Sequence, residues 1–286
     1  MPAVALGLLS AIVYGSADFV GGVAARRIGA LRVTAVGAVS GLALLLLSLP
    51  LVGGAWTPAA LGWGALSGVV GSIAVFLLYA CLAIGPMSIL SPLTAVVSAI
   101  VPLTWGLIGG DRFAPIGYVA LGVALVAVVL VGFVPERGAV RPSGRALLMA
   151  VGAGVFIGAF LILLDQTPAD SGVVPLIANR AVNGAIMWSV VGLAVLRART
   201  RPPGADRFTA RGTGLAAASG VLDASANVLI LIGLRAGDLA TMSVLVALYP
   251  AGTIILAAIV LRERIAPVQW IGLALAVGAA GMLAAA

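Results

Sequence analysis

The sequence predicts an all-α membrane protein in which ten transmembrane helices form two inverted five-helix repeats. Three observations predict this fold: the composition, the length of the apolar stretches, and an internal repeat. Of the 286 residues, 62% are hydrophobic and 9% are charged, and the mean hydropathy is +1.23. A water-soluble chain of this length would not carry such a composition, so we expect lipid around the protein.

The apolar stretches have the length of membrane-spanning helices, because a helix needs about 20 residues to cross about 30 Å of hydrocarbon. They are continuously apolar, whereas the strands of a membrane barrel would alternate polar and apolar residues. Short polar breaks separate ten of them. The predicted spans are approximately residues 3–24, 32–52, 59–83, 87–108, 114–134, 145–165, 174–196, 212–234, 239–261 and 266–285.

Basic residues gather on one side of the predicted membrane. The chain has 16 of them, all arginines, and only Arg112 and Arg235 fall in loops of the opposite side. Because arginine-rich loops stay in the cytoplasm, this pattern places both termini outside it. The arginines of the basic side are Arg26, Arg27, Arg32, Arg137, Arg141, Arg145, Arg197, Arg199, Arg201, Arg207, Arg211, Arg262 and Arg264.

The composition also argues against several classes of function. The net charge of +7 belongs to loops that set topology, so we expect no nucleic-acid partner. The chain has no histidine and a single cysteine, Cys81. An enzyme would need a nucleophile with a base or clustered metal ligands, so we predict no enzyme, no metal and no cofactor.

An internal repeat relates the two halves. A shift of 152 residues places Gly68–Pro115 on Gly220–Pro267 without a gap, with 13 identities in 48 positions. We assign residues 1–137 and 143–286 to the two repeats. Five spans per half is an odd number, so the halves enter the membrane from opposite sides, as in carriers that work by alternating access. The alternative is a duplication kept only for packing.

Three motifs, in this order and spacing, resemble the EamA-type transporters of the drug/metabolite transporter superfamily over essentially the whole chain. They are Val13–Phe19, the turn Gly85–Pro86 with its repeat Gly237–Asp238, and the helix starts Ala114–Gly117 and Ala266–Gly272. The resemblance implies a multi-pass protein of a bacterial plasma membrane that carries a small-molecule substrate. It also implies a cavity surrounded by spans 1, 3, 4, 6, 8 and 9, with spans 5 and 10 at the periphery.

Two carboxylates fall inside predicted spans, where an ionised acid costs about 2.5 to 3.5 kcal/mol and therefore indicates function. Asp223 lies in the eighth span with Asn227 one turn later, and Asp18 lies in the first. Asp223 could bind substrate or proton, or it could be structural, either paired with Arg180 or protonated. Asp18 could line the pathway or pair with Arg26 and Arg27.

Further candidates are polar or aromatic. We expect Arg180 to be an interfacial anchor that reaches towards the headgroups, although it is kept as a provisional substrate contact. Asn179 and Asn183 are expected to bond between helices. Prolines in the fourth and ninth spans should free carbonyls beside a cavity. The other substrate-binding candidates are Tyr14, Tyr79, Ser91, Thr94, Ser98, Trp105, Ser243 and Tyr249.

Taken together, the residues and the resemblance predict a carrier that exports amino acids or related amine-bearing compounds, as a monomer or homodimer. Asp223 would attract the cationic group. The alternatives are proton-coupled efflux of cationic drugs and, from another class, an intramembrane enzyme. Glycine pairs four residues apart, at Gly37–Gly41, Gly64–Gly68 and Gly154–Gly158, predict close helix crossings.

Overall fold

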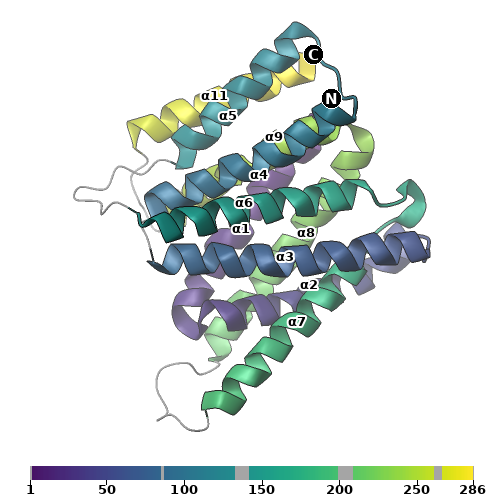
Figure 1. The fold of residues 1–286 in the computed structure, drawn as a ribbon, viewed down its shortest axis with the longest axis vertical. Helices are drawn as coiled ribbons and strands as arrows, with labels where there is room; N and C mark the ends of the chain where they lie inside the picture. Colours follow the sequence, from purple (N-terminus) through teal and green to yellow (C-terminus); the bar gives the residue numbers. More distant parts are fainter. Residues whose placement is uncertain (1, 85–86, 133–141, 199–208, 261–265, 286) are drawn as a thin grey trace.

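The computed structural model describes residues 2–84, 87–132, 142–198, 209–260 and 266–285 (Figure 1), and these residues form helices and no strands. The loops that hold Arg137, Arg141, Arg199, Arg201, Arg207, Arg262 and Arg264, and the turn Gly85–Pro86, lie outside this part. The helices are α1 (Pro2–Ile28), α2 (Ala30–Val52), α3 (Pro58–Ile84), α4 (Met87–Gly109), α5 (Pro115–Gly132), α6 (Gly144–Asp165), the 3₁₀ turn η1 (Ala169–Ser171), α7 (Val174–Ala198), α8 (Ala210–Ala236), α9 (Leu239–Val246), α10 (Tyr249–Val260) and α11 (Pro267–Ala285).

Ten spans agree with these helices once α9 and α10 are taken as one broken span. The break falls at Ala247 and Leu248, because Pro250 has no N–H to donate to the carbonyl of Val246. Helix α4 contains Pro92 and Pro102 and yet continues from Met87 to Gly109. Of these two proline-containing spans, the described residues show an interruption in the ninth alone.

Polar side chains mark the starts of several helices in the described part of the chain. Ser143 accepts a hydrogen bond from the N–H of Ala146 at the start of α6, and Thr209 accepts one from Gly212 at the start of α8. Asp238 accepts a 2.6 Å bond from the N–H of Thr241 at the start of α9. Each cap satisfies a backbone donor that has no partner within the helix.

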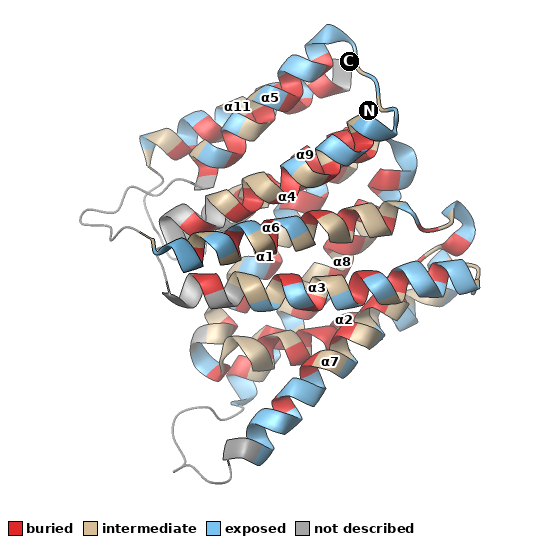
Figure 2. Cartoon of the chain, viewed as in Figure 1, coloured by how far each residue is buried: buried red, intermediate tan, exposed pale blue. Residues whose placement is uncertain are grey.

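The outer faces of the helices are apolar. Within the described residues, six helices are long and apolar enough to cross a membrane, and four shorter apolar stretches accompany them. Figure 2 shows exposed residues on the outward sides of helices whose inward sides are buried. Leu51 and Ile108 are 90% and 80% exposed, which is the pattern of a protein whose surroundings are hydrocarbon.

The packing is organised around α1 and α8, which cross in the middle of the bundle, while α3 packs on α6 and α7. Figure 1 shows both termini on the same side, with α5 and α11 side by side at one edge. Gln269 joins these two helices by donating to the carbonyl of Val131. The expected peripheral place of spans 5 and 10 agrees with this arrangement.

The three predicted glycine pairs lie at helix crossings. A Cβ added to Gly68 of α3 would be 3.1 Å from the Cα of Asn179 in α7, and one added to Gly41 of α2 would be 3.0 Å from the carbonyl oxygen of Gly220 in α8. Gly154 of α6 faces α4 in the same way. Absence of a side chain therefore allows the backbones to come close at these points.

Candidate functional site

A cavity of about 170 Å³ lies between the helices and receives side chains from α1 to α4 and from α6 to α10. Neither α5 nor α11 contributes a lining residue. Compared with the expected ring of spans, α2 and α7 are additions: Thr34 and Gly37 come from α2, and Asn179, Arg180 and Asn183 come from α7. The cavity is therefore enclosed by more helices than the resemblance implied.

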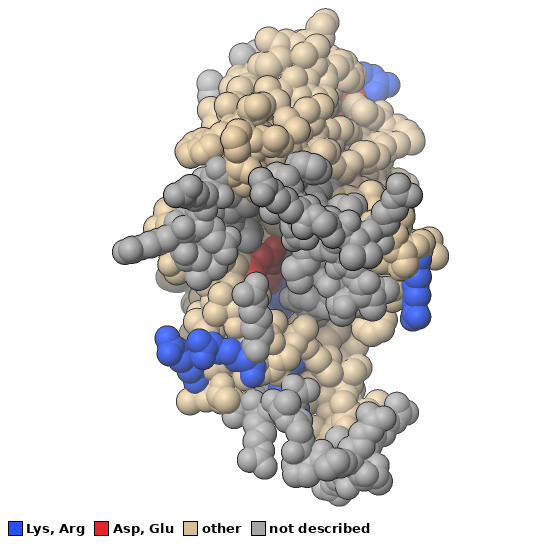
Figure 3. All heavy atoms as spheres, turned by 90° about the vertical axis from the view of Figure 1, so that its left-hand side faces the viewer, with Lys and Arg blue, Asp and Glu red and all other residues tan. Residues whose placement is uncertain are grey.

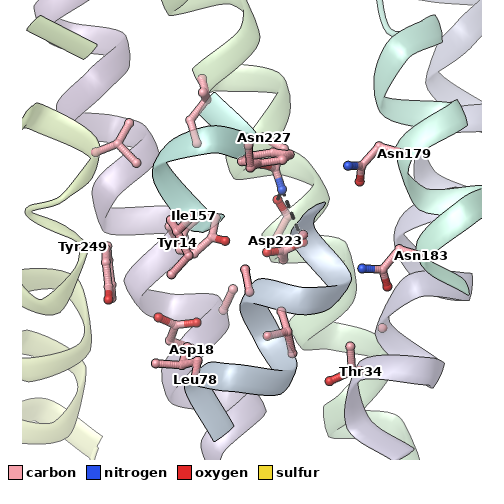
Figure 4. Close-up of a pocket in the computed structure, with 18 of the residues that line it drawn as sticks. Tyr14, Asp18, Thr34, Leu78, Ile157, Asn179, Asn183, Asp223, Asn227 and Tyr249 are labelled. Carbon is pink, nitrogen blue, oxygen red and sulfur yellow. Dashed lines mark hydrogen bonds between the residues drawn. The ribbon is translucent and has the colours of Figure 1, made fainter. Parts of the chain in front are cut away.

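An ion pair between Arg180 of α7 and Asp223 of α8 lies at the centre of the site. The side chains are 14% and 23% exposed, respectively. Asn227 donates to the Asp223 carboxylate at 3.3 Å and to its carbonyl at 2.8 Å, which Figure 4 shows in the cavity wall. The pairing alternative for Asp223 is therefore confirmed.

The same contact corrects the expectation for Arg180. Instead of extending towards the headgroups, its guanidinium lies in the cavity wall beside Asp223. The physical reason is that an opposite charge is within reach on the neighbouring helix, and pairing compensates two charges that would otherwise be buried alone. Arg180 stays among the residues that can contact a ligand.

Asp18 of α1 also lines the cavity, and its side chain is exposed there. In the described part of the chain, no ion pair joins it to Arg27, and the Arg26 side chain lies outside that part. Figure 4 places Asp18 on the side of the cavity where Tyr14 and Tyr249 lie, away from Asn179 and Asn183.

Two predicted aromatic residues meet in the cavity. The rings of Tyr14 and Tyr249 are 5.8 Å apart between centroids and are tilted by 57°. Ser98 and Ser243 line the cavity too, but each hydroxyl donates to a carbonyl of its own helix, Ala95 or Ala240. These serines can therefore offer acceptors to a ligand more readily than donors.

Two other candidates lie away from the cavity. The hydroxyl of Thr94 is buried and donates to the carbonyls of Leu90 and Ala150, so it joins α4 to α6. Trp105 is 54% exposed and does not line the cavity. The structure therefore does not bring these two residues to the cavity, because the sequence does not show which face of α4 points inward. The side chains of Tyr79 and Ser91 lie outside the described residues.

The asparagines of α7 have two different roles. Asn179 donates to the hydroxyl of Ser67 in α3 at 2.8 Å, as expected for a residue that joins helices. Asn183 lines the cavity, and its buried amide oxygen has no hydrogen-bond partner in the described part; the same holds for the amide oxygen of Asn227. The sequence could have indicated that Asn183 faces the cavity, because it lies three residues after Arg180 and therefore on the same helix face.

Hydrogen bonds join the loop between α2 and α3 to the loop between α6 and α7. Val173 donates to the carbonyl of Gly53, and Ala55 donates to that of Asp170. Arg235, at the end of α8, donates to the hydroxyl of Ser171 at 3.0 Å and to the carbonyls of Pro168 and Gly172. Figure 3 shows the face of the protein that lies opposite the two termini, and acidic atoms are visible there inside a hollow.

Residues 144–285 match the model of the EamA-like transporter family. The chain belongs to this family. Its members are membrane transporters of small molecules within the drug/metabolite transporter superfamily. Together with the apolar helices, this makes the protein a multi-pass integral membrane protein.

One solved structure, titled "Crystal structure of protein", shares the fold of this EamA-like transporter with a TM-score of 0.73. The match covers 99% of this chain and 98% of the other at 16% sequence identity. At that identity the likeness shows the fold, which extends over both halves. None of the curated proteins matches the sequence.

Proposed function

We propose that this EamA-like transporter is an alternating-access carrier that exports a small metabolite bearing an amine, such as an amino acid or a related compound. The observation that carries the proposal is the cavity between the helices, where two carboxylates, Asp18 and Asp223, lie beside aromatic side chains. Carboxylates and aromatic faces both attract cations, most strongly where water is scarce.

The size of the cavity favours a metabolite over a drug. Pockets for drug-sized ligands have volumes of about 300 to 1,000 Å³, whereas this cavity has about 170 Å³. The alternative function, proton-coupled efflux of cationic drugs, would have Asp223 or Asp18 bind proton and substrate in turn. That alternative requires the cavity to widen considerably. The third alternative, an intramembrane enzyme, has no support from the family, whose members are transporters.

The helix packing supports two inverted repeats, residues 1–137 and 143–286. Exchange of the halves turns the contact between α1 and α8 into that between α6 and α3, and both contacts exist. The contact of α2 with α8 likewise becomes that of α7 with α3, while α5 and α11 exchange with each other. Halves related in this way can exchange conformations and open a central site to either side in turn.

The same proposal includes the side of the membrane to which the cavity opens. The hollow in Figure 3 lies on the face opposite the termini, and on this face α1 ends at Ile28 and α6 begins at Gly144. If the arginine-rich loops are cytoplasmic, the structure represents a cytoplasm-facing state, and the bonds made by Arg235 belong to the closed outer side.

Transport by purified protein in liposomes tests the proposal. The panel pairs amino acids and simple amines with carboxylic acids of similar size that have no amine. We expect saturable counterflow of at least one amine-bearing compound, and strong loss of it in Asp223→Asn. Because this change leaves Arg180 without its partner, the double variant Arg180→Gln/Asp223→Asn serves as the charge-balanced control. Equal transport of every compound by wild type and Asp223→Asn, or no saturable transport, would reject the proposal.

A further inference from the structure

We propose that Asp18, rather than Asp223, holds the cationic group of the substrate, and that this substrate is a small amine with a second hydrogen-bond donor. This inference rests on the proposed function and refines it. It reassigns the role first predicted for Asp223, and it follows from the charges, the aromatic rings and the unused acceptors of the cavity.

The first step is the charge of the cavity. Asp223 is compensated by Arg180 and accepts a further bond from Asn227. Asp18 has no such partner among the described residues, so the lining carries one negative charge that nothing in its wall balances. A single positive charge on a ligand would balance it, and the low-dielectric surroundings make this attraction strong.

The second step concerns the aromatic side chains around Asp18. Tyr14 lies one helical turn before Asp18 on α1, so both side chains project from the same face. Tyr249 approaches Tyr14 from α10, with 5.8 Å between ring centroids. Figure 4 shows the three side chains on one side of the cavity. A cation held by Asp18 would therefore be close to aromatic faces, which add to its binding.

The third step concerns the opposite wall. The amide oxygens of Asn183 and Asn227 are buried and have no partner in the described part of the chain. A buried acceptor without a donor is costly, and a ligand N–H or O–H can remove that cost. Asn183 lies across the cavity from Asp18 (Figure 4). The ligand class is therefore a short molecule with an ammonium group at one end and a second donor at the other.

Three probes of similar size separate these requirements. Ethanolamine has an ammonium group and a hydroxyl, tetramethylammonium has a charge without donors, and ethylene glycol has donors without a charge. Binding is measured from the midpoint of thermal unfolding of the full chain in detergent, as a function of probe concentration. We expect ethanolamine to stabilise the wild type and to bind at least about tenfold more tightly than the other two.

The variants assign the residue. Asp18→Asn should weaken ethanolamine binding by about tenfold or more, while Asp18→Glu should retain part of it. Arg180→Gln/Asp223→Asn removes two charges that balance each other, so we expect a smaller loss of ethanolamine binding than in Asp18→Asn. Tyr249→Leu alters the aromatic wall without changing any charge, and we expect about a threefold to tenfold loss. It provides a second test if Asp18→Asn does not fold.

The inference is overturned if Asp18→Asn binds ethanolamine as well as the wild type does, or if the Arg180/Asp223 double variant loses as much binding as Asp18→Asn or more. Equal binding of tetramethylammonium, or no stabilisation of the wild type by ethanolamine, would reject the ligand class. Failure of the proposed function is distinguishable, because ethanolamine would still bind in detergent while no compound of the panel crossed the liposome membrane.

Discussion

The ion pair between Arg180 and Asp223 changes how each charged residue of the cavity is interpreted. An acid inside a span is costly by itself, and a partner on the next helix removes most of that cost without removing its structural importance. Asp223 therefore joins α7 to α8, whereas Asp18 keeps a carboxylate directed into the cavity. Two residues of the same type thus have different surroundings, one paired between helices and one directed into the cavity.

Arg180→Gln should be strongly destabilising, since it leaves Asp223 as a half-buried charge without its partner. Breaking such a pair costs about 3 kcal/mol or more, and the double variant Arg180→Gln/Asp223→Asn should recover most of that loss. Thermal unfolding in detergent measures both. Arg145→Gln is the matched control, because Arg145 is exposed at the start of α6 and should be neutral. Additive losses in the double variant would contradict this account.

Much of the site was predictable from residue chemistry, because charges in apolar spans are rare and costly. Asp18, Asp223 and Tyr14 all line the cavity. Prediction and cavity lining differ where the orientation of a side chain decides whether it reaches the cavity. Trp105 is of a residue type common in binding sites, but it faces outward. Asn183 was expected to join helices, but it faces the cavity. A helix of continuous apolar residues gives little periodicity from which to infer its inner face.

At the scale of helices, the close crossing of α3 and α7 can be tested by adding a single methyl group. Gly68→Ala would place its Cβ 3.1 Å from the Cα of Asn179, and it should destabilise the protein by about 1 to 3 kcal/mol. Gly62→Ala is the control on the same helix, because no atom lies within 4 Å of its Cβ position. Equal unfolding midpoints for the two variants would show that the crossing can relax at no cost.

The local stability of the loop between α6 and α7 should depend on Arg235, which donates hydrogen bonds to Pro168, Ser171 and Gly172. Arg235→Ala removes these bonds, so we expect the amides of residues 168–173 to exchange with deuterium about five- to tenfold faster. Arg112→Ala is the control, because Arg112 donates to the carbonyls of Leu107 at the end of α4 and of Asp111 next to it, and to none in residues 168–173. Unchanged exchange in Arg235→Ala would mean that the backbone bonds between the two loops hold this region alone.

The helices were more predictable than the ring they form. Their lengths follow from the thickness of hydrocarbon, so the spans agree with the observed bounds within a few residues. The break before Pro250 has a local cause, the missing backbone donor. The places of α2 and α7 in the cavity wall depend on how closely neighbouring helices approach at glycines such as Gly41. This approach depends on both helices of a pair, so the sequence of a single helix does not predict it.

For the whole molecule, the proposed mechanism requires the arginine-rich loops to face the cytoplasm, and cysteine labelling can test this. In a Cys81→Ser background, Trp56→Cys lies between α2 and α3 and Arg27→Cys lies at the end of α1, on opposite sides of the bundle. A membrane-impermeant maleimide should label the first in intact cells and the second only after permeabilisation, because arginines keep their loops inside. The reverse pattern would turn the hollow outward and make the structure an outward-facing state. Labelling of both sites from outside would contradict the ten-span topology itself, and with it the exchange of inverted halves on which alternating access depends.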